Sequence, residues 1–120
     1  MTTIENITVW KRAVSFARDI YKFCDTNKYI KNNYGFRDQI QRASISIASN
    51  IAEGADRETQ KELIRFLYIS RGSCSELKTQ LYILKELDYI EQVQFDEIVG
   101  ELVQIHKMIN AFIKKASQNL

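Results

Sequence analysis

Apolar residues recur every three or four positions through most of the chain, and this spacing is typical of one face of an α-helix. The first run of this kind follows Thr8, a residue type suited to an N-cap, and extends to about residue 26. Its apolar positions are Trp10, Ala13, Val14, Ala17, Ile20, Tyr21 and Cys24. The pattern predicts a first helix over residues 8–26 with these side chains facing the core.

A polar stretch, DTNKYIKNNYG over residues 25–35, interrupts this pattern. Asn32, Asn33 and Gly35 favour a turn, so we expect the stretch to connect the first helix to a second one. Its large side chains are expected to fold back onto the bundle; they are Tyr29, Ile30 and Tyr34.

Residues 44–47, SISI, alternate serine and isoleucine as a half-buried β-strand would. The surrounding apolar residues nevertheless keep a helical spacing, and a strand of about eighteen residues would be unusually long. The helical positions are Phe36, Ile40, Ala43, Ile47 and Ile51. We therefore predict a second helix over residues 36–53, with Gly54 as its left-handed C-terminal residue.

The segment from Thr59 to Glu62 reads as a capping box, in which the threonine hydroxyl accepts from the Glu62 amide and the glutamate reaches back to the Thr59 amide. A third helix is therefore predicted over residues 60–87. Its apolar seam alternates spacings of four and three: Leu63, Leu67, Ser70, Cys74, Leu77, Leu81 and Leu84.

A last helical pattern covers residues 92–116, with apolar positions at Phe95, Ile98, Leu102, Ile105, Ile109 and Phe112. The links between the second, third and fourth helices are short, which implies that consecutive helices are antiparallel neighbours. The predicted fold is all-α, an antiparallel up-and-down four-helix bundle that forms a single domain over residues 1–120.

The composition agrees with this fold, because 120 residues with 45% hydrophobic content can fill one core and no proline interrupts a helix. There is neither a run of eighteen apolar residues nor the apolar segment of a signal peptide. We therefore expect a cytoplasmic protein that does not contact membranes.

Cys24 and Cys74 lie far apart in the sequence and are expected to be buried, reduced thiols.

The sequence carries no signature of catalysis. Its single histidine, His106, excludes a histidine-rich metal site, and Val103 stands where a di-iron bundle would need a glutamate. Neither a phosphate-binding GxxxxGK[ST] loop nor a dinucleotide-binding GxGxxG motif occurs. We expect no enzyme activity, no cofactor and no bound metal.

Four stretches of the chain resemble one protein family: VWKRA at 9–13, QRASISIASNIAEG at 41–54, ETQKELIRFLYISRGSCSELKTQL at 58–81, and HKMINAFIKK at 106–115. They are similar to the bacterial four-helix bundle proteins named after the intervening sequences of 23S ribosomal RNA genes. The most specific piece is the small-residue signature S-I-x-x-N-I-A-E-G, which occupies residues 46–54. The resemblance covers nearly the whole chain.

This resemblance implies a left-handed bundle that assembles as a ring-like homopentamer without established enzyme activity. The chain is also similar to the accessory protein of diversity-generating retroelements, a pentamer that binds nucleic acid and works with a reverse transcriptase. The partners implied are further copies of the chain, RNA or single-stranded DNA, and a reverse transcriptase or another protein. His106 departs from the family pattern at a usually small position, where we expect a neutral histidine hydrogen-bonded near a helix interface.

The formal charge of +2 is too small to indicate nucleic-acid binding by itself. On the predicted third helix, however, cationic, hydroxyl and aromatic residues alternate along one face: Tyr68, Arg71, Ser75, Lys78, Tyr82 and Lys85. Cations pair with phosphates while tyrosines stack on bases, as in proteins that bind single strands. The alternative is a solvated face that covers the bundle or meets acidic residues, such as those in the acid-rich segment 86–101.

A second apolar stripe on the predicted second helix, formed by Ile45, Ala48 and Ala52, points away from the core positions. It predicts either a broad internal contact or a subunit interface, and the family resemblance favours the interface. Phe16 and Phe23 lie off the predicted core face of the first helix. They belong either to the same interface or to a cover over the connection at residues 27–35.

Asn50, Glu53 and Gly54 complete the signature. We expect Asn50 to bridge to a neighbouring helix, with Arg42 or Arg65 completing a polar network, because a hydrogen-bonded buried amide specifies one packing. A lock on the turn is therefore favoured over a ligand site. Together with the homopentamer that the resemblance implies, these residues lead us to expect a non-enzymatic scaffold that binds nucleic acid; the alternative is a structural or adaptor ring that binds another protein.

Overall fold

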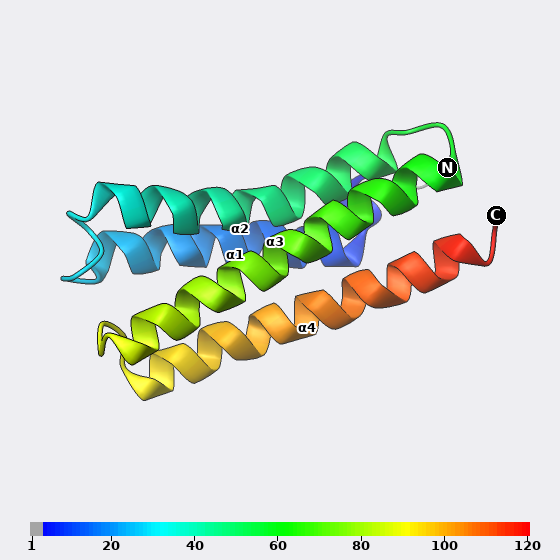
Figure 1. Cartoon of the computed structure of the whole chain (residues 1–120). Helices are drawn as coiled ribbons and strands as arrows, with labels where there is room; N and C mark the ends of the chain where they lie inside the picture. The colour runs from blue at the N-terminus through cyan, green and yellow to red at the C-terminus, as the bar shows by residue number, and fades with distance from the viewer. Residues whose placement is uncertain (1–3) are drawn as a thin grey trace.

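The computed structural model describes residues 4–120, which contain a short 3₁₀ helix and four α-helices (Figure 1). The elements are η1 Ile4–Asn6, α1 Thr8–Thr26, α2 Tyr34–Ala55, α3 Gln60–Glu86 and α4 Gln92–Ser117. The four α-helices begin and end within two residues of the predicted ranges, and no strand occurs among the described residues. The prediction of an all-α fold is confirmed.

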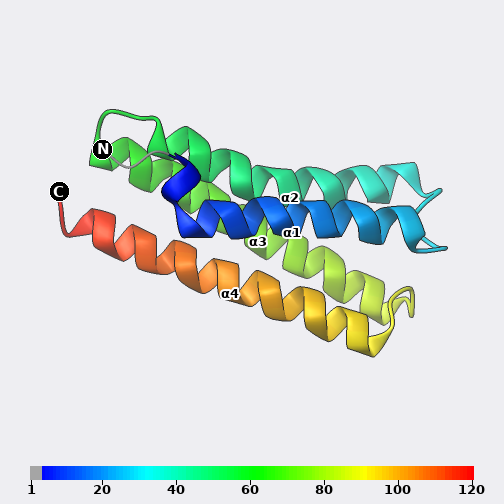
Figure 2. The ribbon, with the colours of Figure 1, turned by 180° about the vertical axis from the view of Figure 1, so that it is seen from behind.

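Successive helices run in opposite directions, so that α1 with α2 and α3 with α4 form two hairpins (Figures 1 and 2). The elongated bundle measures 46 × 21 × 20 Å. The α2–α3 contact is the most extensive, whereas α1 and α4 touch least among the four neighbouring pairs of α-helices. The up-and-down arrangement therefore agrees with the prediction, while its left-handed sense stays a prediction.

The start of α1 differs from the prediction, because Thr8 is the first helical residue and Ile7 is the N-cap. Ile7 makes no side-chain capping bond. Its amide instead donates to the Ile4 carbonyl at 3.0 Å, which joins η1 directly to α1. A 3₁₀ turn thus occupies the place that a capping hydroxyl was expected to fill.

The buried face of α1 is rotated from the predicted one and consists of Val9, Ala13, Phe16, Ile20, Phe23 and Cys24. Phe16 and Phe23 are only 3% exposed, so their assignment to a subunit interface is wrong. Val14 and Tyr21, predicted to be core residues, are 43% and 37% exposed. Large aromatic side chains bury more apolar area than valine, which favours the face that turns both phenylalanines inward.

Asn27 organises the connection between α1 and α2. Its side-chain oxygen accepts from the amides of Tyr29 and Ile30, and its Nδ2 donates to the Tyr89 carbonyl at 2.7 Å. Ile30 is fully buried, and Tyr29 stacks on Tyr89 with ring centroids 4.4 Å apart. Both fold back as predicted, whereas Tyr34 begins α2 and is 68% exposed.

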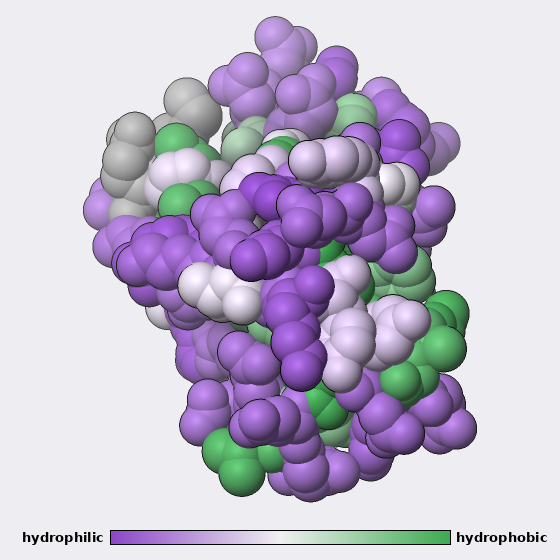
Figure 3. Space-filling model, turned by 90° about the vertical axis from the view of Figure 1, so that its left-hand side faces the viewer, coloured by the Kyte–Doolittle hydropathy of each residue, from purple (hydrophilic) through white to green (hydrophobic). Residues whose placement is uncertain are grey.

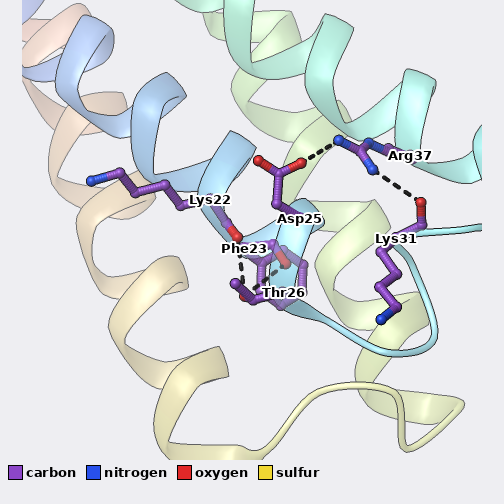
Figure 4. Close-up of polar contacts among 6 residues, drawn as sticks. All are labelled: Lys22, Phe23, Asp25, Thr26, Lys31 and Arg37. Carbon is purple, nitrogen blue, oxygen red and sulfur yellow. Dashed lines mark hydrogen bonds and ion pairs between the residues drawn. The ribbon is translucent and has the colours of Figure 1, made fainter.

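Polar contacts close this hairpin at the ends of its two helices (Figure 4). Arg37 at the start of α2 pairs with Asp25 on α1 and donates to the Lys31 carbonyl at 2.9 Å. The Thr26 hydroxyl donates to the Lys22 carbonyl at 3.0 Å. Seen from the end that carries both hairpin connections, the molecule is mostly hydrophilic, with hydrophobic residues in separate patches (Figure 3).

At the α2–α3 turn, one of the two bonds of the predicted capping box forms at Thr59, whereas the predicted bond from the Thr59 amide to the Glu62 carboxylate is not found among the described residues. The Thr59 hydroxyl accepts from the Glu62 amide at 3.2 Å, while the Glu62 carboxylate pairs with Arg65 at 2.7 Å. Gly54 lies within α2, and no described glycine has a positive φ. A Cβ at Gly54 would lie 2.9 Å from the Phe66 Cβ. The glycine is therefore required by the close approach of α2 and α3, and the predicted left-handed cap is wrong.

Replacing Gly54 by alanine is predicted to destabilise the fold by about 1–3 kcal/mol, because the added methyl group overpacks the α2–α3 contact. Urea unfolding followed by circular dichroism measures this change. Gly100→Ala is the matched control: nothing lies within 4 Å of that mid-helix position, so alanine should stabilise by about 0.5–1 kcal/mol. Equal changes in the free energy of unfolding for Gly54→Ala and Gly100→Ala would contradict the close approach of α2 and α3 at Gly54.

The two thiols are buried as predicted. Burial raises the pKa of Cys24 to about 11 and that of Cys74 to about 12. Both groups therefore remain protonated thiols at pH 8, and the thiol is a poor nucleophile compared with the thiolate.

We predict that neither thiol of the folded protein reacts with a disulfide reagent at pH 8 within minutes, whereas both react at once in denaturant. Absorbance of the released thiolate measures the reaction. Rapid labelling of either cysteine in the folded protein would show that the core opens more readily than this packing implies.

Candidate nucleic-acid interface

The structure brings the predicted cationic and aromatic residues of α3 onto one surface beside α4. This surface, here called the basic face, consists of Tyr68, Arg71, Ser75, Lys78, Tyr82 and Lys85. Tyr68 and Tyr82 are 48% and 46% exposed. The adjoining side of α3 carries the predicted apolar seam, in which Leu67, Cys74 and Leu77 are buried. Packing of that seam therefore places the basic face on the flank of α3 toward α4.

Arg71 is held near the N-terminal end of the basic face by two contacts. Its guanidinium lies over the Tyr68 ring, 4.5 Å from the centroid. Its Nη1 donates to Oδ1 of Asn110 on α4 at 3.0 Å. Five N–H donors are available on a guanidinium, so this arrangement orients Arg71 and leaves donors for a phosphate.

The other end of the basic face is arranged by Phe95, a buried residue of α4. Tyr82 meets the Phe95 ring edge-on at a centroid distance of 5.0 Å, and the Lys85 ammonium lies 4.6 Å from the centroid of that ring. Aromatic edge contacts and cation–π contacts restrict both side chains. The face is therefore ordered in part by α4, which the sequence pattern of α3 could not indicate.

In the described part of the chain, no ion pair involves Arg71, Lys78 or Lys85. The acid-rich segment 86–101 lies near the α3–α4 turn, yet its Glu101 pairs with Arg12 on α1, with N–O distances of 2.5 and 3.0 Å. The three cations thus form a local positive surface that is not paired with any carboxylate among the described side chains.

His106 on α4 lies close enough to this surface to sense its charge. Its pKa is lowered from the ordinary value, chiefly by burial and further by the positive charges of Arg71 and Lys78. The lowered pKa favours the neutral imidazole, whereas the hydrogen bond expected for this residue is not found among the described residues. An anion bound between these cations would weaken their effect on the imidazole.

Ser46 and Asn50 tie α2 to α3. The Asn50 amide donates to both the carbonyl and the hydroxyl of Ser46 at 2.9 Å, and the Ser46 hydroxyl lies 2.8 Å from that of Ser73. The Ser70 hydroxyl adds a buried bond to the Ile47 carbonyl at 2.7 Å. The hydrogen bonds between α2 and α3 are therefore made by serines. The sequence-based prediction did not include these serines, because it assigned arginines as the partners of Asn50.

Neither Arg42 nor Arg65, the two arginines expected to bond with Asn50, joins this bridge, and Glu53 contacts a different arginine. Glu53 pairs with Arg57 at 2.6 Å on the surface, and Arg65 pairs with Glu62. Arg42 is exposed. The Asn50, Glu53 and Gly54 signature thus acts on the α2–α3 packing, and the polar network predicted with Arg42 or Arg65 is wrong.

The candidate interface residues of α2 divide between core and surface. Ala48 is only 8% exposed and packs in the core, so its assignment to a subunit interface is wrong. Ile45 is 43% exposed, and Ala52 is partly buried. On α1, the exposed Val14 and Tyr21 were missed as surface residues because their helical spacing matches that of a core face.

The described residues contain no group of three or more His, Cys, Asp or Glu side chains that could hold a metal ion.

A groove of about 710 Å³ lies at the end of the bundle near the α2–α3 turn, with Ile7, Leu63, Met108 and Phe112 among its lining residues. Across residues 4–120, the helices lack the combination of length and apolar character that a membrane span requires.

Comparisons with known proteins agree with this architecture. The family model of the 23S rRNA-intervening sequence protein matches residues 5–111. A crystal structure of a protein with unknown function from the S23 ribosomal protein family of Bacteroides thetaiotaomicron has 26% sequence identity and a TM-score of 0.80, covering 89% of this chain and 96% of that chain. No curated protein matches the chain significantly. These similarities indicate family and fold without indicating a catalytic family.

Proposed function

The chain belongs to the 23S rRNA-intervening sequence protein family, and on that premise we propose that it is a non-enzymatic, homopentameric scaffold that binds RNA or single-stranded DNA. The observation that carries this proposal is the basic face of α3. It combines two half-exposed tyrosines with three cations for which the described residues provide no carboxylate partner.

The basic face suits a flexible single strand. Arg71, Lys78 and Lys85 follow one another at about one position per two helical turns, roughly 10 Å apart. Phosphates along an extended strand can meet them in succession, while bases can stack on Tyr68 or Tyr82. A ring would repeat these cations around its circumference and strengthen the attraction.

Salt-dependent binding tests this proposal. Anisotropy of labelled single-stranded RNA and DNA should show binding at low salt, and changing Arg71, Lys78 and Lys85 together to glutamine should weaken it at least tenfold. The slope of log affinity against log salt should fall by about 2, since each neutralised phosphate contributes about 0.7 for a single strand.

The matched control changes Lys107, Lys114 and Lys115 of α4 to glutamine, which removes the same charge outside the basic face. This variant should retain most of the affinity. An equal loss in both triple variants would indicate diffuse attraction and contradict a defined face.

His106 is the single histidine of the chain and offers a local probe. In the free protein, its proton NMR titration should give a pKa below the ordinary value. A bound phosphate would offset the charges of Arg71 and Lys78, so saturating oligonucleotide should raise that pKa. An unchanged titration in the complex would place the strand elsewhere on the molecule.

The apolar groove at the bundle end favours a second candidate, an adaptor ring that binds another protein, such as a reverse transcriptase. Its lining by Ile7, Leu63, Met108 and Phe112 suits an apolar peptide segment. Absence of oligonucleotide binding at low salt would favour this function over the first.

A further inference from the structure

The outward surface of α3 has a composition that packing within one chain does not explain. Residues at alternating spacings of four and three form this outer α3 face: Arg65, Ile69, Gly72, Glu76, Thr79, Ile83 and Glu86. Ile69 and Ile83 are 41% and 43% exposed. The face thus presents two isoleucines on either side of Gly72 and Glu76.

Gly72 lies in the middle of a 27-residue helix, where glycine is less favourable than alanine. A Cβ at this position would meet nothing within 4 Å, and the residue has no positive φ. Gly54, by contrast, is required by contact with Phe66. An exposed glycine between isoleucines leaves the α3 backbone open to a second polypeptide.

A second apolar surface lies along the α1–α2 hairpin. This α1–α2 face consists of Trp10, Val14, Ala17, Tyr21, Ile45 and Ala52. Val14 and Ile45 are each 43% exposed. Asp25 pairs with Arg37 near the connection of these antiparallel helices, and equal steps along both helices from that pair place Ala17 at the height of Ile45. The apolar positions of the two helices therefore lie at matching heights along the hairpin.

We propose that the outer α3 face of one copy of the chain docks on the α1–α2 face of the next copy. This inference rests on the self-association proposed above and specifies its two surfaces. Contact between unlike surfaces is heterologous, and repeated with the required rotation it closes a ring.

The two faces complement each other in shape and charge. Gly72 on one side and Ala17 and Ala52 on the other allow close backbone approach. Glu76 lies between Ile69 and Ile83, and Arg42 lies one helical turn before Ile45. Both are exposed, and neither takes part in an ion pair within the described residues. A second copy therefore supplies the apolar and charged partners that each face lacks.

This contact leaves the basic face accessible. Arg71 and Lys85 lie on the side of α3 that meets α4, as their contacts with Asn110 and Phe95 show. The outer α3 face is turned away from that side. Assembly and strand binding can therefore use different surfaces of the same helix.

Two variants test the docking. Gly72→Leu blocks the outer α3 face and Ile45→Arg blocks the α1–α2 face, while each leaves the other face intact. Light scattering should find each variant alone as a 14.0 kDa single chain and an equal mixture as a particle of about 28 kDa, because one productive contact remains. Circular dichroism should show both folded, and Gly72→Leu should melt at a higher temperature than an Ile45→Arg monomer.

Gly100→Leu is the matched control and should assemble as the natural sequence does, because Gly100 is an exposed helical glycine outside both faces. A 14 kDa particle for the natural chain at micromolar concentration overturns self-association itself. If the natural chain assembles and Gly72→Leu assembles equally, the outer α3 face is not the contact. If Gly72→Leu by itself forms two-chain particles, the intact α1–α2 faces of two copies contact each other, and the heterologous arrangement is wrong.

A charge exchange tests the pairing of the faces. Glu76→Arg and Arg42→Glu should each weaken assembly at least tenfold, and the double variant should recover most of it. A double variant no better than either single one would overturn the juxtaposition of these two residues.

Discussion

The close approach of α2 and α3 is the constraint on which the rest of the bundle depends. Gly54 has no room for a Cβ beside Phe66, and a buried hydroxyl of Ser70 reaches the Ile47 carbonyl at 2.7 Å. Small residues at such a contact let two backbones approach and let short side chains bond across. The serine- and alanine-rich segment SISIASNIAEG therefore supplies this packing surface from one side of a helix. Each residue type occurs on both sides, because Ser44 and Ile47 are buried while Ile45 is exposed.

The α2–α3 contact also determines which surfaces of α3 remain exposed for binding to other molecules. Its apolar seam and the side toward α2 are used in holding the bundle, and its side toward α4 orders Arg71 and Lys85. The basic face and the outer α3 face remain exposed. Because a helix of 27 residues extends along much of the bundle's 46 Å length, both surfaces are long and nearly straight. A scaffold function is consistent with such surfaces.

The helices could be predicted because their apolar spacing and the cap at Thr59 are local properties of the sequence, and the basic face followed from helical geometry alone. The partners of that face could not be predicted. Asn110, Phe95 and His106 reach it only through the register of α4 against α3, which depends on tertiary packing. Gly54 was misassigned for the same reason, since glycine suits both a left-handed cap and a crowded helix contact.

The inward face of α1 was mispredicted for a different reason, because α1 is apolar on two sides. Val14 and Tyr21 keep the same helical spacing as the buried Phe16 and Phe23, so periodicity alone cannot rank the two faces. In the folded bundle, the larger side chains of Phe16 and Phe23 are buried on the side toward α4, whereas Val14 and Tyr21 are exposed to solvent. A surface helix needs only one apolar face to hold its place in a bundle. The second apolar face of α1 therefore adds nothing to the fold of a single chain, and in the proposed ring it gains stability by being covered with the outer α3 face of the next copy.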